Sequence, residues 1–131
     1  MDIPNKYRFV DDDEYFRIYT KNDIKIDELY GKVLYLGMGD LYIPRKQPDA
    51  VIKTTIVEID PEVIALNKPK IKPDWEIICE DAYTYKPTIY YDFIVADIWY
   101  LLQPKKHMEE FRKLYESYGD KIYFLEKIFI W

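Results

Sequence analysis

A short apolar run that ends at two glycines is the feature that most constrains this chain. Val33 to Leu36 is continuously apolar, as is typical of a parallel strand covered on both faces, and Gly37 and Gly39 follow it. Glycine adopts backbone angles that other residues avoid, and without a Cβ it lets a ligand lie against the main chain. A Gly-x-Gly after a strand is a weak signal by itself, because a tight turn explains it equally well.

Strands and helices alternate in the rest of the chain. Runs rich in apolar or β-branched residues predict further strands at residues 54–59, 75–79, 91–97 and 122–125. Helical periodicity and caps predict helices at 61–68 and between Pro104 and Gly119, whereas Pro44 and Pro48 limit the first crossover helix to a short or irregular one. This alternation predicts an α/β fold with a Rossmann-like, doubly wound, mostly parallel sheet.

The first thirty residues are less regular. Tyr7–Val10 and Tyr15–Tyr19 predict a hairpin or an N-terminal extension, separated by the acidic run 11–14, which is best interpreted as a solvated turn. Ile24–Ile26 alternates as an edge strand would. With 131 residues, we expect a single domain, 1–131.

Charge and composition narrow the class of partner. Lys and Arg number 19 against 24 Asp and Glu, a net charge of -5 that disfavours nucleic acid and anionic membrane. No apolar run approaches the roughly 20 residues of a membrane span, and the N-terminus lacks a basic-then-apolar signal, so a cytoplasmic location is expected. Cys79 lies in an apolar segment and is predicted to be a small core residue; with His107 as the single histidine, a structural zinc site is not expected.

Three predicted strands end on carboxylates, and the carboxyl ends of parallel strands meet at one edge of a sheet. Glu58 lies about 20 residues past the glycines, where a carboxylate can accept two hydrogen bonds from a ribose diol. Asp81 could accept from the exocyclic amine of an adenine, with the backbone at Ala82 completing the base edge. Each acid alone is better explained as a helix cap or a solvated loop residue; their joint spacing favours a binding site.

From about Lys32 to Glu126 the chain resembles the class I S-adenosylmethionine-dependent methyltransferases, and within them it is most similar to the spermidine synthase-type branch. The residues that carry this resemblance are 33–40, 57–64, 80–82 and 91–97. The resemblance implies a minimal methyltransferase fold with S-adenosylmethionine as cofactor. In the family's pattern another glycine stands where this chain has Leu41, and the helix that follows is here interrupted by prolines, so a displaced glycine loop is expected.

The same resemblance implies a role for each matching residue. Gly37 and Gly39 would approach the methionine part of the cofactor, Asp40 its amino group, Glu58 the ribose hydroxyls, Asp81 with Ala82 the adenine, and Asp97 the reacting centre. Trp99 and Tyr100 could wall the substrate pocket or contact the cationic methyl group, and a core role for Trp99 is an equal alternative.

Methyl transfer to a small-molecule acceptor is therefore the leading function. An aminopropyltransferase and a non-catalytic S-adenosylmethionine-binding or regulatory module are the alternatives. The apolar C-terminal segment 122–131 predicts a homo-oligomer, because an exposed edge strand tends to pair with another chain. The competing expectation is that the N-terminal hairpin covers that edge and leaves a monomer.

Overall fold

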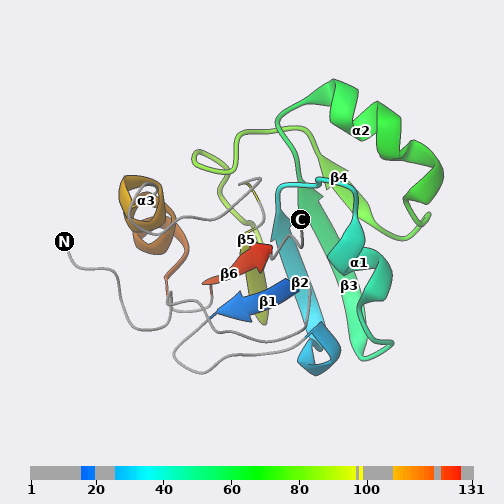
Figure 1. Ribbon diagram of the computed structural model, residues 1–131, viewed down its shortest axis with the longest axis horizontal. Helices are drawn as coiled ribbons and strands as arrows, with labels where there is room; N and C mark the ends of the chain where they lie inside the picture. Colours follow the sequence, from blue (N-terminus) through cyan, green and yellow to red (C-terminus); the bar gives the residue numbers. More distant parts are fainter. Residues whose placement is uncertain (1–15, 20–25, 97, 99–107, 120–121, 128–131) are drawn as a thin grey trace.

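The computed structural model describes residues 16–19, 26–96, 98, 108–119 and 122–127. Within them, six strands form one sheet in the order β1-β6-β5-β2-β3-β4 (Figure 1). The strands are β1 (Phe16–Tyr19), β2 (Gly31–Leu36), β3 (Val51–Val57), β4 (Glu76–Ile78), β5 (Phe93–Ala96) and β6 (Ile122–Lys127). The helices are α1 (Tyr42–Lys46), α2 (Pro61–Asn67) and α3 (Met108–Tyr118), with short 3-10 turns η2 (Ile26–Glu28) and η3 (Lys68–Lys70). Neighbouring strands run parallel except for β1 and β6, so the mostly parallel α/β sheet is confirmed.

The central strand β2 is buried on both faces. Side chains alternate across a strand, so Leu34 and Leu36 enter one core cluster while Val33 and Tyr35 enter the other. All four are at most 1% exposed, and burying an apolar side chain of this size contributes about 1.5–3 kcal/mol. This two-sided burial explains why the segment reads as continuously apolar.

Helices cover both faces of the sheet, which makes it doubly wound. Leu114 of α3 packs in the cluster of Leu34, whereas Ile43 of α1 and Val63 of α2 pack with the cluster of Tyr35. In Figure 1, α3 accordingly lies apart from α1 and α2, which cover the other face beside β3 and β4. The expectation of a doubly wound fold is thus confirmed.

The first crossover helix is short, as predicted. α1 has five residues, and Pro44 is its third. A proline in the first turn removes no intrahelical hydrogen bond, because the first N–H groups of a helix have no partner within it. The N–H of Arg45 does reach back, donating to the carbonyl of Leu41 at 3.1 Å.

The second helix begins as its sequence predicts. The Asp60 side chain accepts from the N–H of Glu62 at 2.9 Å, and Pro61 occupies the first helical position. α2 ends at Asn67, and the 3-10 turn η3, which contains Pro69, follows it directly.

The N-terminal strand covers the edge of β6, which is one of the two arrangements that the sequence leaves open. Residues Phe16–Tyr19 pair antiparallel with Phe124–Lys127 of β6. Because β1 already covers β6, an exposed edge at this strand no longer argues for an oligomer. Residues 128–131 of the predicted contact segment lie outside the described residues. The oligomeric state itself stays a prediction.

Two expectations for the N-terminal part differ from the structure. Ile26 belongs to the 3-10 turn η2 and not to an edge strand; residues 24 and 25 lie outside the described residues. The turn places Leu29 in the core, where it is 1% exposed. In a strand that continued from Ile24, Leu29 would lie on the face opposite to Ile24 and Ile26. Of the predicted hairpin, only Phe16–Tyr19 is described, and its partner there is β6.

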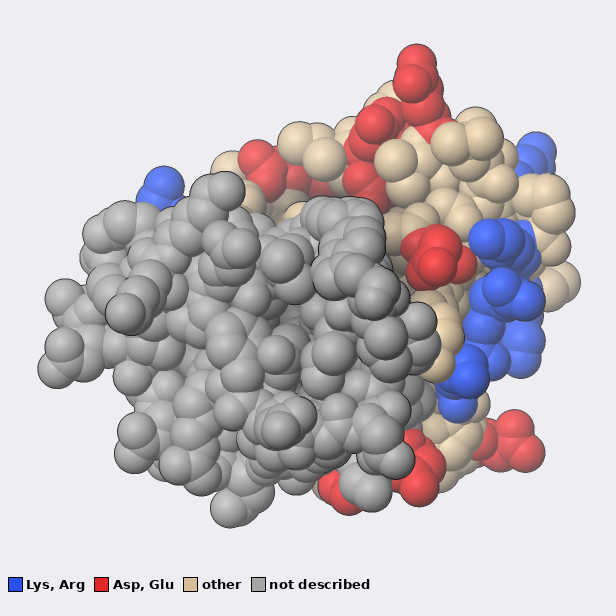
Figure 2. Space-filling model, in the orientation of Figure 1, with Lys and Arg blue, Asp and Glu red and all other residues tan. Residues whose placement is uncertain are grey.

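On the face shown in Figure 2, the basic side chains gather in one place, and acidic side chains lie both above and below them. Figure 2 shows Lys and Arg side chains gathered on the flank beside α1, and Asp and Glu over α2 and the neighbouring end of the sheet. None of the helices in the described part is long and apolar enough to cross a membrane. The cytoplasmic location and the absence of a nucleic-acid partner stay predictions.

Candidate functional site

The carboxyl ends of four parallel strands lie in one row at an edge of the sheet. Leu36 of β2 pairs with Val57 of β3 on one side and with Ala96 of β5 on the other. Val57 in turn pairs with Ile78 of β4, and the N–H of Glu58 extends this contact by donating to the carbonyl of Ile78 at 2.9 Å. The loops that follow β2, β3 and β4 therefore begin side by side, as the sequence predicts for Gly37 and Glu58.

The loop after β2 bends through three left-handed residues. Gly37 has a φ of 94°, Gly39 of 53° and Leu41 of 64°. The N–H of Gly37 donates to the carbonyl of Val57 at 2.8 Å, and the N–H of Leu41 donates back to Met38 at 2.9 Å. The two glycines thus meet a backbone requirement, because left-handed angles favour glycine.

Leu41 adopts the backbone conformation that a glycine would take at this position. Its side chain is fully buried, at 0% exposure, in the cluster that contains Tyr35. Burial of a leucine contributes about 1.5–3 kcal/mol, which offsets the roughly 1–2 kcal/mol that a left-handed angle costs. The departure from the family's glycine pattern is therefore compatible with a tight loop.

Glu58 ties the glycine loop to the loop after β3. Its Oε1 accepts from the N–H of Met38 at 2.9 Å, and its Oε2 accepts from the N–H of Asp60 at 3.0 Å. Each carboxylate oxygen has a second lone pair, so each can accept one more hydrogen bond. The carboxylate is only half-buried and keeps access to solvent.

The other predicted acids make local hydrogen bonds. Asp40 is exposed, and its Oδ1 accepts from the N–H of Tyr42 at 3.1 Å, at the start of α1. Asp81 is half-buried, and its Oδ1 accepts from the N–H of Tyr83 at 2.9 Å. The carbonyl of Ala82, which is buried, accepts from the hydroxyl of Tyr118. Helix-start and turn roles are thus present alongside any role in binding.

Tyr118 attaches α3 to the loop after β4. Its hydroxyl contacts the carbonyl of Ala82 and that of Tyr85, the latter at 3.3 Å. Burial raises the pKa of Tyr118 above its ordinary value, and the neighbouring Tyr85 and Asp81 raise it further. The phenol therefore stays protonated and acts as a donor.

Two residues that sequence reasoning missed contribute to this edge. Asn67 is buried at 6% exposure, and its Nδ2 donates to the carbonyl of Gly39 at 2.8 Å. Its signal in the sequence is a polar residue four positions after Val63, on the apolar face of α2. Ile59 follows Glu58 and is 61% exposed; its signal is an apolar residue beyond the buried end of β3.

The prediction that Cys79 is a core residue is wrong. Cys79 is exposed, because β4 ends at Ile78 and the next residue already belongs to the loop. Its Sγ donates to the carbonyl of Ile59 at 3.7 Å, so the thiol lies at the same edge.

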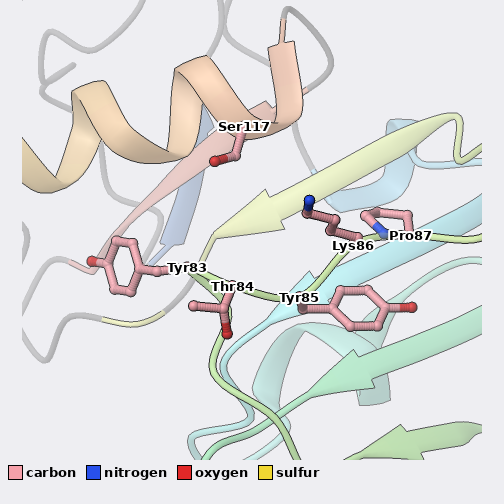
Figure 3. Close-up of a pocket in the computed structure, with 6 residues that line it drawn as sticks. All are labelled: Tyr83, Thr84, Tyr85, Lys86, Pro87 and Ser117. Atoms are coloured by element: carbon pink, nitrogen blue, oxygen red, sulfur yellow. The ribbon is translucent and has the colours of Figure 1, made fainter.

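A cavity of about 480 Å³ lies between α3 and the segment that follows Ala82. It is lined by Tyr83, Thr84, Tyr85, Lys86, Pro87 and Ser117. Figure 3 shows Ser117 on α3 facing this segment, with the rings of Tyr83 and Tyr85 pointing to opposite sides of it. Burial raises the pKa of Tyr83 to about 12, and the charges of Glu110 and Asp81 add to this effect. The lining includes none of the site residues predicted from the sequence.

Three predicted residues, Asp97, Trp99 and Tyr100, lie outside the described residues. The strand before them is described: Ala96 ends β5 beside Leu36, at the edge that carries the glycine loop. Their roles stay predictions.

No protein-family model matches the chain, and no curated protein matches it either. Solved structures do. A complex of DhpI with SAH is 22% identical, with a TM-score of 0.55 over 71% of this chain and 44% of that one. The N-methyltransferase NodS from Bradyrhizobium japonicum WM9 is 16% identical, with a TM-score of 0.51 over 72% of this chain and 56% of that one.

A third similar structure is a putative methyltransferase from Thermoplasma acidophilum, 15% identical, with a TM-score of 0.53 over 79% of this chain and 53% of that one. The chain thus spans about half the length of the structures it matches. At these identities the likeness concerns the fold. The chain has the Rossmann-like α/β fold of S-adenosylmethionine-dependent methyltransferases.

Proposed function

We propose that this chain binds S-adenosylmethionine at the carboxyl edge of β2, β3 and β4 and transfers its methyl group to a small-molecule acceptor. The observation that carries the proposal is the position of Glu58. Its carboxylate lies at the end of β3, next to the glycine loop, and both oxygens keep acceptor capacity. A vicinal diol, such as that of a ribose, offers the two donors that this carboxylate can take.

The surroundings of Glu58 suit the rest of such a cofactor. Gly39 is exposed and lacks a side chain, so a ligand can approach the backbone of the loop, with Asp40 beside it to accept from an amino group. Ile59 offers an exposed apolar surface for one face of the adenine ring. We assign Asp81 and the backbone of Ala82 to the edge of the base. The similar structures that contain S-adenosylhomocysteine support this cofactor class.

The chemistry asks this chain mainly to position two reactants. The cofactor supplies a methyl group on a cationic sulfur that is already a good leaving group. The glycine loop and Glu58 would hold it in one orientation, and alignment of this kind is worth several kcal/mol of the barrier. We assign to Asp97 the orientation of the acceptor and the removal of its proton, and to Trp99 and Tyr100 the wall of the acceptor pocket.

A calorimetric titration of the purified chain with S-adenosylmethionine and with S-adenosylhomocysteine tests the binding. We expect saturable one-to-one binding of both. Absence of heat and of any thermal stabilisation with both ligands would refute the proposal. Incubation with methyl-labelled S-adenosylmethionine and a panel of amines, phenols and carboxylic acids then tests transfer.

Aminopropyl transfer is the second candidate, in keeping with a spermidine synthase-like branch. The acids that follow β3 and β4 favour it, because the carboxylates of Glu58, Asp60 and Asp81 are exposed or half-buried and would attract a polyamine cation. Decarboxylated S-adenosylmethionine with putrescine separates the two activities. A product from this pair, with none from methyl donors, would replace methyl transfer by aminopropyl transfer, and binding without either product would leave a non-catalytic module.

A further inference from the structure

The end of α2 carries a buried polar side chain in an unusual place. Val63 and Ile64 of α2 pack against the core cluster that holds Tyr35, and Asn67 lies one helical turn further on the same face. An asparagine is a poor helix former, and its burial without partners would be costly. A buried amide at this position therefore calls for specific hydrogen bonds.

Both donor hydrogens of the Asn67 amide have partners. Nδ2 lies 2.9 Å from the carbonyl of Val63, one turn back in its own helix, and 2.8 Å from the carbonyl of Gly39. The first bond is local and could form in an isolated helix. The second spans 28 residues and joins the helix to the glycine loop.

The glycine loop is thus held from two sides. Glu58 accepts from the N–H of Met38, and Asn67 donates to the carbonyl of Gly39, the next residue. Gly39 has a φ of 53° in a loop where other residues are also left-handed, so without a partner its peptide could rotate at little cost. Glu58 thus holds the Gly37–Met38 peptide, and Asn67 holds the Gly39–Asp40 peptide, so that the two side chains fix the loop on either side of the Met38–Gly39 bond.

We propose that Asn67 is a positioning residue for the cofactor, because its amide holds the Gly39 carbonyl and so preorganises the loop on which the cofactor lies. This inference rests on the proposed function. It extends that function to a buried residue that acts through the loop: Asn67 donates to the carbonyl of Gly39, and its effect appears as ligand affinity.

The replacement Asn67→Asp tests the donor. The shape is kept, but a carboxylate would face two carbonyl oxygens, Gly39 and Val63, with no hydrogen to donate. Burial and the two oxygens raise the pKa of that carboxyl, and its protonation restores one donor. We expect S-adenosylhomocysteine to bind about tenfold or more weakly than to the parent at about pH 8, with much of the loss regained near pH 5.5.

A matched control is Gln47→Glu. Gln47 also forms a side-chain amide network, accepting from the Tyr35 hydroxyl and donating to Thr54, both at 2.7 Å, near the amino end of β3. Its replacement should lower the stability while leaving the affinity for S-adenosylhomocysteine within about twofold of the parent. Hydrogen exchange without ligand gives a second readout: the N–H of Leu41, which donates to Met38, should exchange faster in Asn67→Asp and not in Gln47→Glu.

The outcomes separate the two proposals. If the parent binds neither S-adenosylmethionine nor S-adenosylhomocysteine, the proposed function fails. If the parent binds but both Asn67→Asp and Asn67→Ala keep the parent's affinity, the positioning role is overturned. It is likewise overturned if both variants lose affinity by the same factor at about pH 8 and about pH 5.5 and this loss is no larger than the loss in Gln47→Glu. It is also overturned if neither Asn67 variant folds, because the residue would then serve the core alone.

Discussion

Replacing Glu58 by glutamine should weaken cofactor binding without unfolding the protein. The carboxylate accepts from two backbone N–H groups, those of Met38 and Asp60, and an amide offers only one acceptor atom. One of these contacts is lost, together with one acceptor for the ribose, and a hydrogen bond to a charged group contributes about 1.5–3 kcal/mol. We therefore expect the Kd for S-adenosylhomocysteine to rise about 10- to 150-fold.

Calorimetric titration of parent and Glu58→Gln measures this change, and a thermal melt checks the fold. Glu62→Gln is the matched control, because it removes the same charge from an exposed residue of the neighbouring helix α2. Its Kd should stay within about twofold of the parent, since an exposed charge is well screened. A folded Glu58→Gln that binds as tightly as the parent would refute the assignment of Glu58 to the ribose.

Three further predictions concern stability and association. Gly31→Ala should destabilise the fold by more than Gly119→Ala, for which roughly 1–2 kcal/mol is expected. Both glycines have a positive φ, but a Cβ at Gly31 would meet the Asp92 carboxylate, whereas a Cβ at Gly119 would meet no atom; equal destabilisation in urea unfolding would contradict this prediction. Burial raises the pKa of Tyr35 above its ordinary 10.0, so the folded state keeps a proton that the unfolded state releases. The contribution of Tyr35 to stability should therefore be constant below about pH 10 and be lost above it, and urea titrations should show a smaller fall above pH 10 in Tyr35→Phe than in the parent. Removing residues 1–19 should uncover the edge of β6 and increase self-association in sedimentation, and a truncated chain that stays monomeric would count against the edge-covering role of β1.

The sheet could be predicted from the sequence because its central strands are buried on both faces. Val33–Leu36 reads as apolar throughout, and the glycines and Glu58 follow their strands at distances that parallel register preserves. The cap at Asp60 was equally local, since one side chain and the next two residues determine it. Features set by near neighbours were therefore predictable.

The features that were missed or mistaken depend on contacts distant in sequence. The pairing of β1 with β6 joins residues more than 100 positions apart, and it was only one of two open arrangements. The apolar run predicts that Cys79 lies in the core, but the strand pairing ends at Ile78 and Cys79 is exposed. Asn67 is recognisable as a polar residue on the apolar face of α2, but the sequence does not reveal its partner, because the Gly39 carbonyl lies 28 residues away.

Leu41 and Asn67 show how a glycine loop can be kept in shape with two glycines where the family pattern has more. At Leu41 the left-handed angle is tolerated because the side chain is fully buried, so the core favours the turn that the backbone disfavours. Gly39 has no side chain that could be buried to hold its backbone, and the hydrogen bond from Asn67 to its carbonyl holds the backbone instead. Leu41→Gly would then remove the steric cost but also the buried side chain, and should lower the stability while keeping the turn. The shape of this loop accordingly depends on the core beneath it, which the pattern of glycines alone does not reveal.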